Sequence, residues 1–137
     1  MKDLKYLLNR SQMTSKHFEI LLSAYDNSIH YLDHLIGKIV TILKQQGVYD
    51  NTLLIILSDH GDNIGDHELM SHYFSLYDTL IKIPLLIKFP RNIGLSGKIS
   101  KVVQNVDIFP SILSMLSIQD TNIWDQIQGN DLLEKQL

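Results

Sequence analysis

The sequence predicts an α/β fold, in which helices pack against a β-sheet. Apolar residues recur at alternating spacings of four and three across residues 15–47, which is typical of a long amphipathic helix. Two continuous apolar runs follow at residues 52–57 and 83–89, and a helical pattern returns at residues 106–116. A helix, a buried strand, a loop, a strand and a helix in this order are typical of a layered sheet.

The composition is that of a globular chain long enough to bury a core. Of its 137 residues, 45% are hydrophobic and 20% charged, and the formal net charge is −3. This charge gives no support for binding to nucleic acid, which favours clustered Lys and Arg. Because the chain has no cysteine, disulfides, Cys-ligated zinc and a cysteine nucleophile are excluded within it.

The sequence leaves the cellular compartment open. No stretch approaches the roughly 18 apolar residues of a membrane span. Residues 1–6 are mixed and charged, without the apolar core of a secretory signal. This second observation is informative only if Met1 is the natural start.

The long helix is expected over residues 15–47, after an irregular lead-in at residues 1–14. Ser15 is a candidate N-cap, and Gly47 follows the last apolar position, where a left-handed residue commonly ends a helix. The apolar stripe is expected to cover one face of the sheet. It consists of Leu21, Tyr25, Ile29, Leu32, Ile36, Ile39 and Leu43.

The run at residues 52–57 lacks alternation and is rich in branched side chains, which predicts a central strand covered on both faces. The polar segment at residues 58–72 follows it, where ligands usually bind in such sheets. The remaining expected elements are a short helix at 73–80, a strand at 83–89 with Pro84 at its beginning, a loop at 90–98, a short strand at 99–103, a helix at 106–116 with Pro110 in its first turn, and a less regular tail at 117–137.

Asp59 and His60 directly follow the first strand and are candidate metal ligands. Carboxylates and neutral imidazoles bind divalent cations, and a strand end holds their backbones rigidly. Gly61 would allow a turn that swings both side chains toward one ion. The alternative is that Asp59 caps a turn and His60 is a polar loop residue.

The wider pattern resembles the sulfatase family of the alkaline-phosphatase superfamily. Members carry a strand that ends in Ser-Asp-His-Gly or Ser-Asp-Asn-Gly, followed by Gly-Asp/Glu-His, a Lys or His, Leu-Tyr-Asp/Glu and a Val/Ile-Pro-Leu-Ile strand. Here residues 58–67, 72–78 and 83–87 match these motifs in order. The resemblance extends to residues 25–29, 32–33, 36–37, 50–52, 106–110 and 129–133.

The resemblance implies a layered α/β/α sandwich of the alkaline-phosphatase-like type, incomplete because its amino-terminal half is lacking. It implies that Asp59 and His60 bind a divalent metal ion, Ca²⁺ first, with Mn²⁺ and Zn²⁺ as alternatives. It also implies that His72 contacts the sulfate or phosphate oxygens of an ester substrate and that His67 lies near the same group. Both are therefore candidate catalytic and substrate-binding residues.

Other polar residues give weaker evidence of a functional role. His30 and His34 stand four apart, a spacing that can chelate metal, but a solvated helix face explains them as well. Asp62 and Asp66 could add carboxylates to the metal site or be ordinary loop residues. Asp33 matches a recurring helix aspartate of the family and is read as structural.

The chain departs from the family in its nucleophile. Members carry a Cys/Ser-x-Pro-x-Arg motif far upstream, and none of Pro84, Pro90 or Pro110 has a Ser two residues before it with an Arg two residues after. The chain is therefore expected to be the carboxy-terminal part of a sulfate ester hydrolase, inactive alone, with a missing amino-terminal half as its partner. Two alternatives stay open: a phosphonate or phosphate ester hydrolase or phosphoryl or phosphoethanolamine transferase, and a non-catalytic interaction module or remnant.

Overall fold

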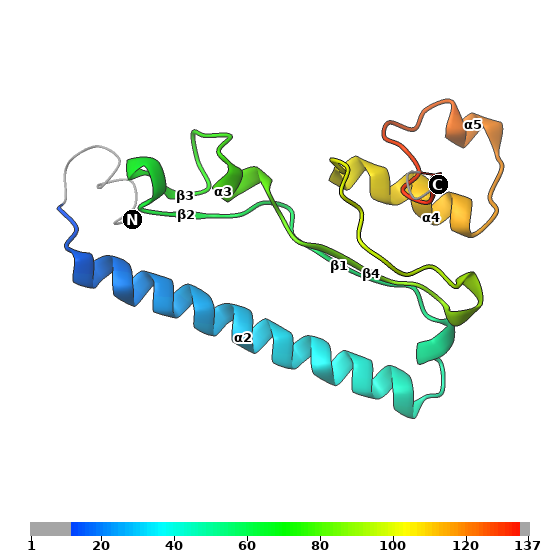
Figure 1. Cartoon of the computed structure of the whole chain (residues 1–137), viewed down its shortest axis with the longest axis horizontal. Helices are drawn as coiled ribbons and strands as arrows, with labels where there is room; N and C mark the ends of the chain where they lie inside the picture. The colour runs from blue at the N-terminus through cyan, green and yellow to red at the C-terminus, as the bar shows by residue number, and fades with distance from the viewer. Residues whose placement is uncertain (1–11, 135–137) are drawn as a thin grey trace. The chain divides into compact units, whose positions relative to one another are not determined.

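The computed structural model describes residues 12–134, and the chain divides into two compact units, Met1–Gly94 and Leu95–Leu137 (Figure 1). Most of the expected irregular lead-in lies outside the described residues, and residues 12–14 form neither helix nor strand. No helix within residues 12–134 combines the length and apolarity needed to cross a bilayer. Helices and strands occur together in the first unit, as the α/β prediction requires.

The first unit begins with one long helix, α2 (Ser15–Gln45). With 31 residues it is about 46 Å long at the usual rise per residue. Its N-cap is Thr14 and not the predicted Ser15, because the Thr14 N–H donates to Nδ1 of His17 at 3.1 Å and so satisfies an amide at the helix start. Gly47 has a φ of +70° just past the helix, which confirms it as the left-handed terminator.

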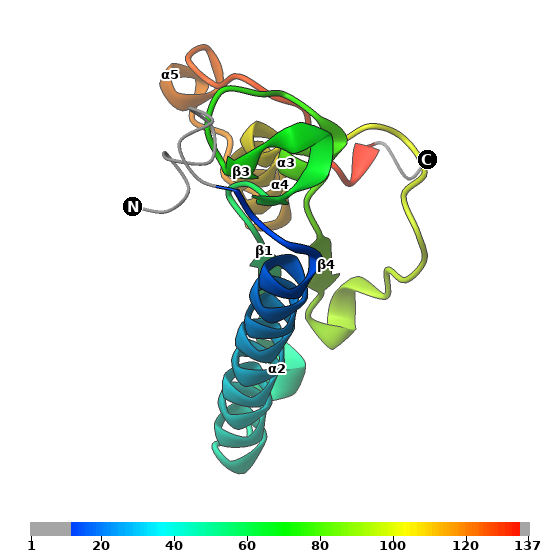
Figure 2. The same cartoon turned by 90° about the vertical axis from the view of Figure 1, so that its left-hand side faces the viewer.

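The prediction that the stripe of α2 covers a sheet face is wrong for the residues described. No residue of α2 is buried. The exposed fractions of four stripe residues lie between 41% and 56%: Tyr25, Ile29, Leu32 and Ile39. Two-stranded sheets are too narrow to cover a helix of this length. Near its N-terminal end the helix lies beneath β2 (Asn63–Ile64), as Figure 1 shows, and Figure 2 gives the view turned by 90°. At its other end it contacts the 3-10 turn at Tyr49–Asn51.

Strands β1 (Leu54–Leu57) and β4 (Leu85–Lys88) form an antiparallel pair, with Leu54 opposite Lys88 and Leu57 opposite Leu85. Both are shorter than predicted, and Pro84 lies just outside β4. Among the described residues β1 pairs with β4 alone, and its side chains are half-buried or exposed. The prediction of a central strand covered on both faces is therefore wrong here, since the covering layers are not among the described elements.

The expected polar loop at residues 58–72 contains a small hairpin. Strands β2 and β3 (Met70–Ser71) pair antiparallel around the 3-10 turn η2 (Asp66–Glu68). The helix predicted at 73–80 is reduced to α3 (Asp78–Ile81). Phe74 has a φ of +63°, which no right-handed helix accommodates, so the helix cannot begin earlier.

Short 3-10 turns replace two of the expected connections. The turn η1 (Tyr49–Asn51) joins α2 to β1, and η3 (Arg91–Ile93) lies in the predicted loop after β4. The Lys88 ammonium donates to the carbonyls of Tyr49 and Thr52, the latter at 3.0 Å. This side chain ties the end of β4 to the chain entering β1 and so fixes the register of the pair.

The second unit is helical where it is described. It contains η4 (Asn105–Asp107), α4 (Ile108–Met115) and α5 (Thr121–Trp124). Pro110 is the third residue of α4, as predicted for the first turn. The strand expected at residues 99–103 is wrong: no strand lies within residues 95–134, and Val102 is 86% exposed. A short apolar run needs a neighbouring strand, and the described unit offers none.

Asp107 is the buried polar centre of the second unit. Its Oδ2 accepts the Gln104 N–H at 3.0 Å, and its Oδ1 accepts the Asn130 N–H at 2.8 Å. A Cβ added at Gly129 would lie 2.4 Å from the Val106 carbonyl oxygen, so only glycine lets this loop approach. The carboxylate therefore joins the start of α4 to the carboxy-terminal segment.

Candidate functional site

The turn after β1 is held by its own hydrogen bonds. The Ser58 hydroxyl donates to the His60 carbonyl at 2.6 Å, and the His60 N–H donates to Oδ1 of Asp59 at 3.0 Å. The Gly61 N–H then donates to the Leu80 carbonyl at 2.8 Å, which anchors the turn to α3. The backbone that carries Asp59 and His60 is thus fixed from both sides.

Gly61 is required here for closeness and not for an unusual φ. A Cβ at this position would lie 2.0 Å from the carbonyl oxygen of Thr79, a distance that no real side chain tolerates. The sequence prediction that Gly61 permits a turn is thereby given its physical reason, which is contact with the chain entering α3.

The Asp59 and His60 side chains turn toward each other. Nδ1 of His60 lies 2.7 Å from the Gly61 carbonyl oxygen, which can only accept, so Nδ1 carries the proton of this hydrogen bond. Nε2 then faces Oδ2 of Asp59 at 3.7 Å. In the neutral imidazole these are two electron-pair donors facing each other, an arrangement that a proton or a cation beside them would stabilise.

The Asp59 carboxylate is the most exposed part of the pair, at 87% of its side chain against 46% for His60. Hydrogen bonds from its own backbone N–H and from that of His60 lower the pKa of Asp59 below its usual 3.8, and the nearby His60 and His72 lower it further. Asp59 is therefore anionic at neutral pH, which suits a metal ligand.

His72 lies in the same cluster. Its ring centroid is 4.4 Å from that of His60, and its Nδ1 is 3.6 Å from Oδ1 of Asp62. His67 is placed differently: it stacks on Tyr77 with ring centroids 3.8 Å apart and shares no ring contact or ion pair with His60 or His72. The structure thus brings Asp59, His60 and His72 together and leaves His67 apart.

Backbone strain is concentrated around these histidines. Four of the five non-glycine residues with positive φ within residues 12–134 fall between 67 and 74, namely His67, Glu68, Ser71 and Phe74. Each such conformation costs on the order of 1–3 kcal/mol and persists only where surrounding contacts enforce it. Strain of this kind is frequent at functional sites.

Asn63 supplies part of that enforcement, and sequence reasoning missed it. It is fully buried; its amide donates to the Ser75 hydroxyl at 3.3 Å, and its Oδ1 accepts the Thr79 hydroxyl at 2.6 Å. Through these bonds Asn63 ties β2 to Ser75, which precedes α3, and to Thr79 within α3. The only sequence signal was its place inside the family-like motif.

Asp59 and His60 are suitable types of ligand for a divalent cation, but two ligands are too few. An anionic oxygen and an imidazole with a free Nε2 are suitable donors, whereas hard cations take about six or more. Within residues 12–134 no group of three or more His, Cys, Asp or Glu side chains is arranged to hold a metal ion. Further ligands would have to come from water, substrate or another segment.

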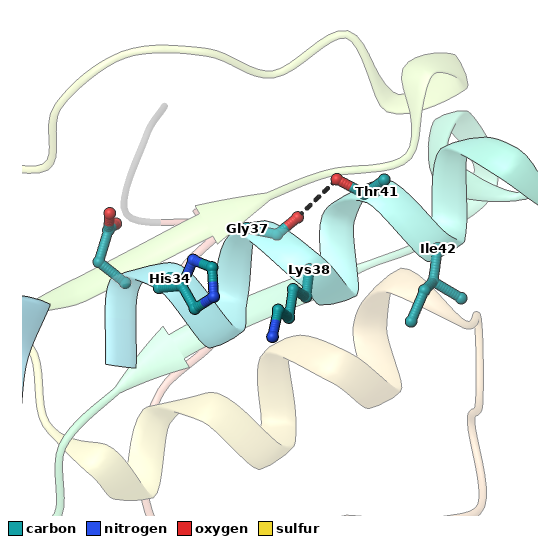
Figure 3. Close-up of a pocket in the computed structure, with 6 residues that line it drawn as sticks. His34, Gly37, Lys38, Thr41 and Ile42 are labelled. Carbon is teal, nitrogen blue, oxygen red and sulfur yellow. Dashed lines mark hydrogen bonds between the residues drawn. The ribbon is translucent and has the colours of Figure 1, made fainter. Parts of the chain in front are cut away.

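The second histidine pair proves to be unrelated to this cluster. His30 and His34 are exposed on α2, and His34 borders a shallow hollow shown in Figure 3. All of its lining comes from this one helix: Asp33, His34, Gly37, Lys38, Thr41 and Ile42. No residue of a second element contributes to this lining. The interpretation of His30 and His34 as part of a solvated helix face remains the simpler one.

The chain is similar to known sulfatases over most of its length. A family model described as Sulfatase matches residues 9–118. An arylsulfatase of Clostridium perfringens is 35% identical over 82% of this chain and 24% of its own. The multifunctional alkaline phosphatase superfamily protein PehA of Trinickia caryophylli is 32% identical over 69% of this chain and 18% of its own.

A solved structure agrees with these relatives. The phosphonate monoester hydrolase SpPMH from Silicibacter pomeroyi superposes with a TM-score of 0.74 at 26% identity, covering 90% of this chain and 23% of that one. This likeness confirms the predicted alkaline-phosphatase-like α/β class. The chain spans between 15% and 24% of the length of the curated relatives compared.

Proposed function

The chain belongs to the sulfatase family, and on that premise we propose that it is the segment of a sulfate ester hydrolase that supplies Asp59 and His60 to a divalent metal site. Ca²⁺ is the proposed ion, with Mn²⁺ and Zn²⁺ as alternatives. An exposed carboxylate is a hard ligand of the kind that Ca²⁺ prefers, and one imidazole also accommodates the other two.

The observation that carries this proposal is the pairing of Nε2 of His60 with Oδ2 of Asp59 at 3.7 Å. The Gly61 carbonyl holds the proton on Nδ1, as backbone carbonyls do for metal-ligating histidines elsewhere. When bound, a divalent cation would supply charge stabilisation for the oxygens of the transferred group. Asp59 and His60 would orient that ion, since their turn is fixed at Ser58 and Gly61.

We propose that His72 contacts the ester group of the substrate. The same role for His67 has less support. The His72 ring lies beside His60, where an imidazole N–H could donate to a sulfate oxygen or to the leaving oxygen. His67 instead packs on Tyr77 in this conformation, with a strained backbone. The place of His67 near the substrate therefore rests on the family resemblance alone.

The partner that we propose is the remainder of a sulfatase domain, on the same or another chain. The nucleophile motif of the family does not occur in these 137 residues, and within residues 12–134 no third His, Cys, Asp or Glu joins Asp59 and His60 in an arrangement that could hold a metal ion. The exposed apolar stripe of α2 offers a surface for that remainder to cover. The chain alone would then hydrolyse no sulfate ester.

A second candidate function is hydrolysis of phosphonate or phosphate esters. The superposed SpPMH is described as a phosphonate monoester hydrolase, and PehA as a multifunctional protein of the same superfamily. Sulfate and phosphate groups both place their oxygens tetrahedrally around a central atom, so a metal ion held by Asp59 and His60, together with His72, would serve either. The sulfatase reading takes precedence because the family model and the arylsulfatase support it.

The test is complementation. The chain is assayed alone and mixed with the amino-terminal part of a related sulfatase, using 4-nitrophenyl sulfate and a phosphonate monoester as separate substrates. We expect no turnover by the chain alone, turnover by the mixture with sulfate preferred, and loss of that turnover in His60→Gln. Two results would refute the proposal. One is hydrolysis by the chain alone that disappears in His60→Gln, and the other is turnover by the mixture that is unchanged in His60→Gln.

A further inference from the structure

We propose that Asp62 is the positioning residue of His72: its carboxylate holds the Nδ1 proton of the ring and leaves Nε2 for the ester group. The inference deepens the proposed function, since it assumes that His72 serves the ester. Its physical content, the pairing of Asp62 with one nitrogen of His72, can be measured without metal, substrate or turnover.

The first support is an oxygen that lacks a hydrogen bond. The Asp62 side chain is 36% exposed overall, yet its Oδ1 is buried and has no hydrogen-bond partner among the described residues. Burying a carboxylate oxygen without a donor is costly. Nδ1 of His72 lies 3.6 Å away, just beyond hydrogen-bond range, so a small shift of either side chain would satisfy Oδ1.

The second support is the way in which the ring is held. His72 lies beside the rings of His60 and Tyr73, with centroids at 4.4 and 4.5 Å. Its Nδ1 edge faces Asp62, and the Ser71 hydroxyl also lies 3.4 Å from this nitrogen. A hydroxyl can donate or accept, whereas a carboxylate can only accept, so Asp62 is the group that requires a proton on Nδ1.

The consequence is a choice of tautomer. A neutral imidazole carries one N–H, and the partner of one nitrogen decides the state of the other. With the proton held at Nδ1, the lone pair lies on Nε2, and any proton taken up or given out by the ring passes through Nε2. Asp62 would thus act through His72 and would not itself touch the ester or ligate the ion.

The test reads the tautomer by long-range ¹⁵N–¹H spectra of the histidine rings in the full chain, at about pH 8.5, above the usual histidine pKa of about 6.5. In the unaltered chain we expect the protonated ring nitrogen of His72 to be Nδ1. In Asp62→Asn the protonated nitrogen should change to Nε2 in most molecules, and Asp62→Glu should restore part of the Nδ1–H form. Asp78→Asn is the matched control, because that exposed carboxylate pairs with Lys82.

Two results would overturn the inference. One is an His72 spectrum that is the same in Asp62→Asn and in the unaltered chain. The other is loss of the Nδ1–H form in Ser71→Ala with Asp62 intact, which would assign the tautomer to the hydroxyl. If Asp62→Asn loses its dispersed amide spectrum, the Ser71→Ala comparison decides, and retention of Nδ1–H there supports Asp62.

A metal titration distinguishes this inference from the alternative that Asp62 is itself a metal ligand. It also tests the proposed function separately. If Asp62 positions His72, Asp62→Asn changes the tautomer and leaves Mn²⁺ affinity within about twofold, whereas a metal-ligating Asp62 would lose about tenfold or more. That loss would overturn the positioning role. Failure of Asp59 and His60 to bind Mn²⁺ would instead count against the proposed function and would leave the tautomer result standing.

Discussion

Nε2 of His60 faces Oδ2 of Asp59 at 3.7 Å, on two consecutive residues whose backbone leaves a strand. Consecutive side chains in a strand point to opposite faces, so this pairing depends on the turn that begins at Ser58. This turn depends on Gly61, which lies against the backbone of Thr79 in α3. The close contact between Gly61 and Thr79 therefore helps to decide where the nitrogen of the neighbouring imidazole lies.

Gly61→Ala should destabilise the first unit by about 1–3 kcal/mol, the usual cost of forcing an atom into a packed site. The new methyl would meet the Thr79 carbonyl at 2.0 Å. Urea denaturation measures the change. Gly37→Ala is the matched control: nothing lies within 4 Å of its Cβ, and it should stabilise α2 by about 0.5–1 kcal/mol. Equal effects at the two glycines would contradict the packing described here.

Asn63→Ala should cost about 1–3 kcal/mol, because the half-buried hydroxyl groups of Ser75 and Thr79 would lose their buried partner. Amide exchange in residues 75–81 should accelerate in the same variant. Asn51→Ala, at an exposed position of η1, should stay within about 0.5 kcal/mol. An Asn63→Ala protein as stable as its Asn51 counterpart would show that the segment is held by other contacts.

Asp107→Ala should loosen the second unit. The amides of Gln104 and Asn130 would each lose a buried acceptor, at about 1–3 kcal/mol apiece. Hydrogen exchange at those two amides is the measurement. Asp125→Ala removes an exposed carboxylate of the same unit and serves as the control. Unchanged protection of both amides in Asp107→Ala would rule out the bridging role.

The carboxyl of Asp59 should titrate below its usual pKa of 3.8 in ¹³C spectra. Because the folded pKa is lowered, the ionised carboxylate stabilises the folded chain above pH 3.8, and this contribution disappears as the pH falls through the folded value. His60→Ala should raise the pKa only in part, since the backbone hydrogen bonds, the leading cause, remain. A midpoint at or above 3.8 in the unaltered chain would contradict the turn geometry.

Local patterns in the sequence predicted the elements that are long and periodic. The 3.6-residue stripe and Gly47 gave the course of α2, and Pro110 gave the start of α4. The N-cap was missed by one residue, because Thr14 and Ser15 are both good caps. The hairpin of β2 and β3 was missed because two-residue strands show no alternation.

The site could be predicted only as far as its motif extends. Asp59, His60 and His72 were found because their spacing resembles a family, and the structure places them together. The buried Asn63 and the tautomer of His60 depend on contacts made by folding, which no local pattern reveals. The exposed stripe of α2 was mispredicted for the same reason, since periodicity identifies an apolar face but not what covers it.

The central claim is that Asp59 and His60 hold one divalent ion together, and Mn²⁺ binding followed by electron paramagnetic resonance tests it most directly. We predict weak binding by the unaltered chain, a loss of about tenfold or more in Asp59→Asn and in His60→Gln, and no further loss in the double variant. Asp78→Asn should bind as the unaltered chain does. Equal Mn²⁺ affinity in all of these proteins would contradict the claim.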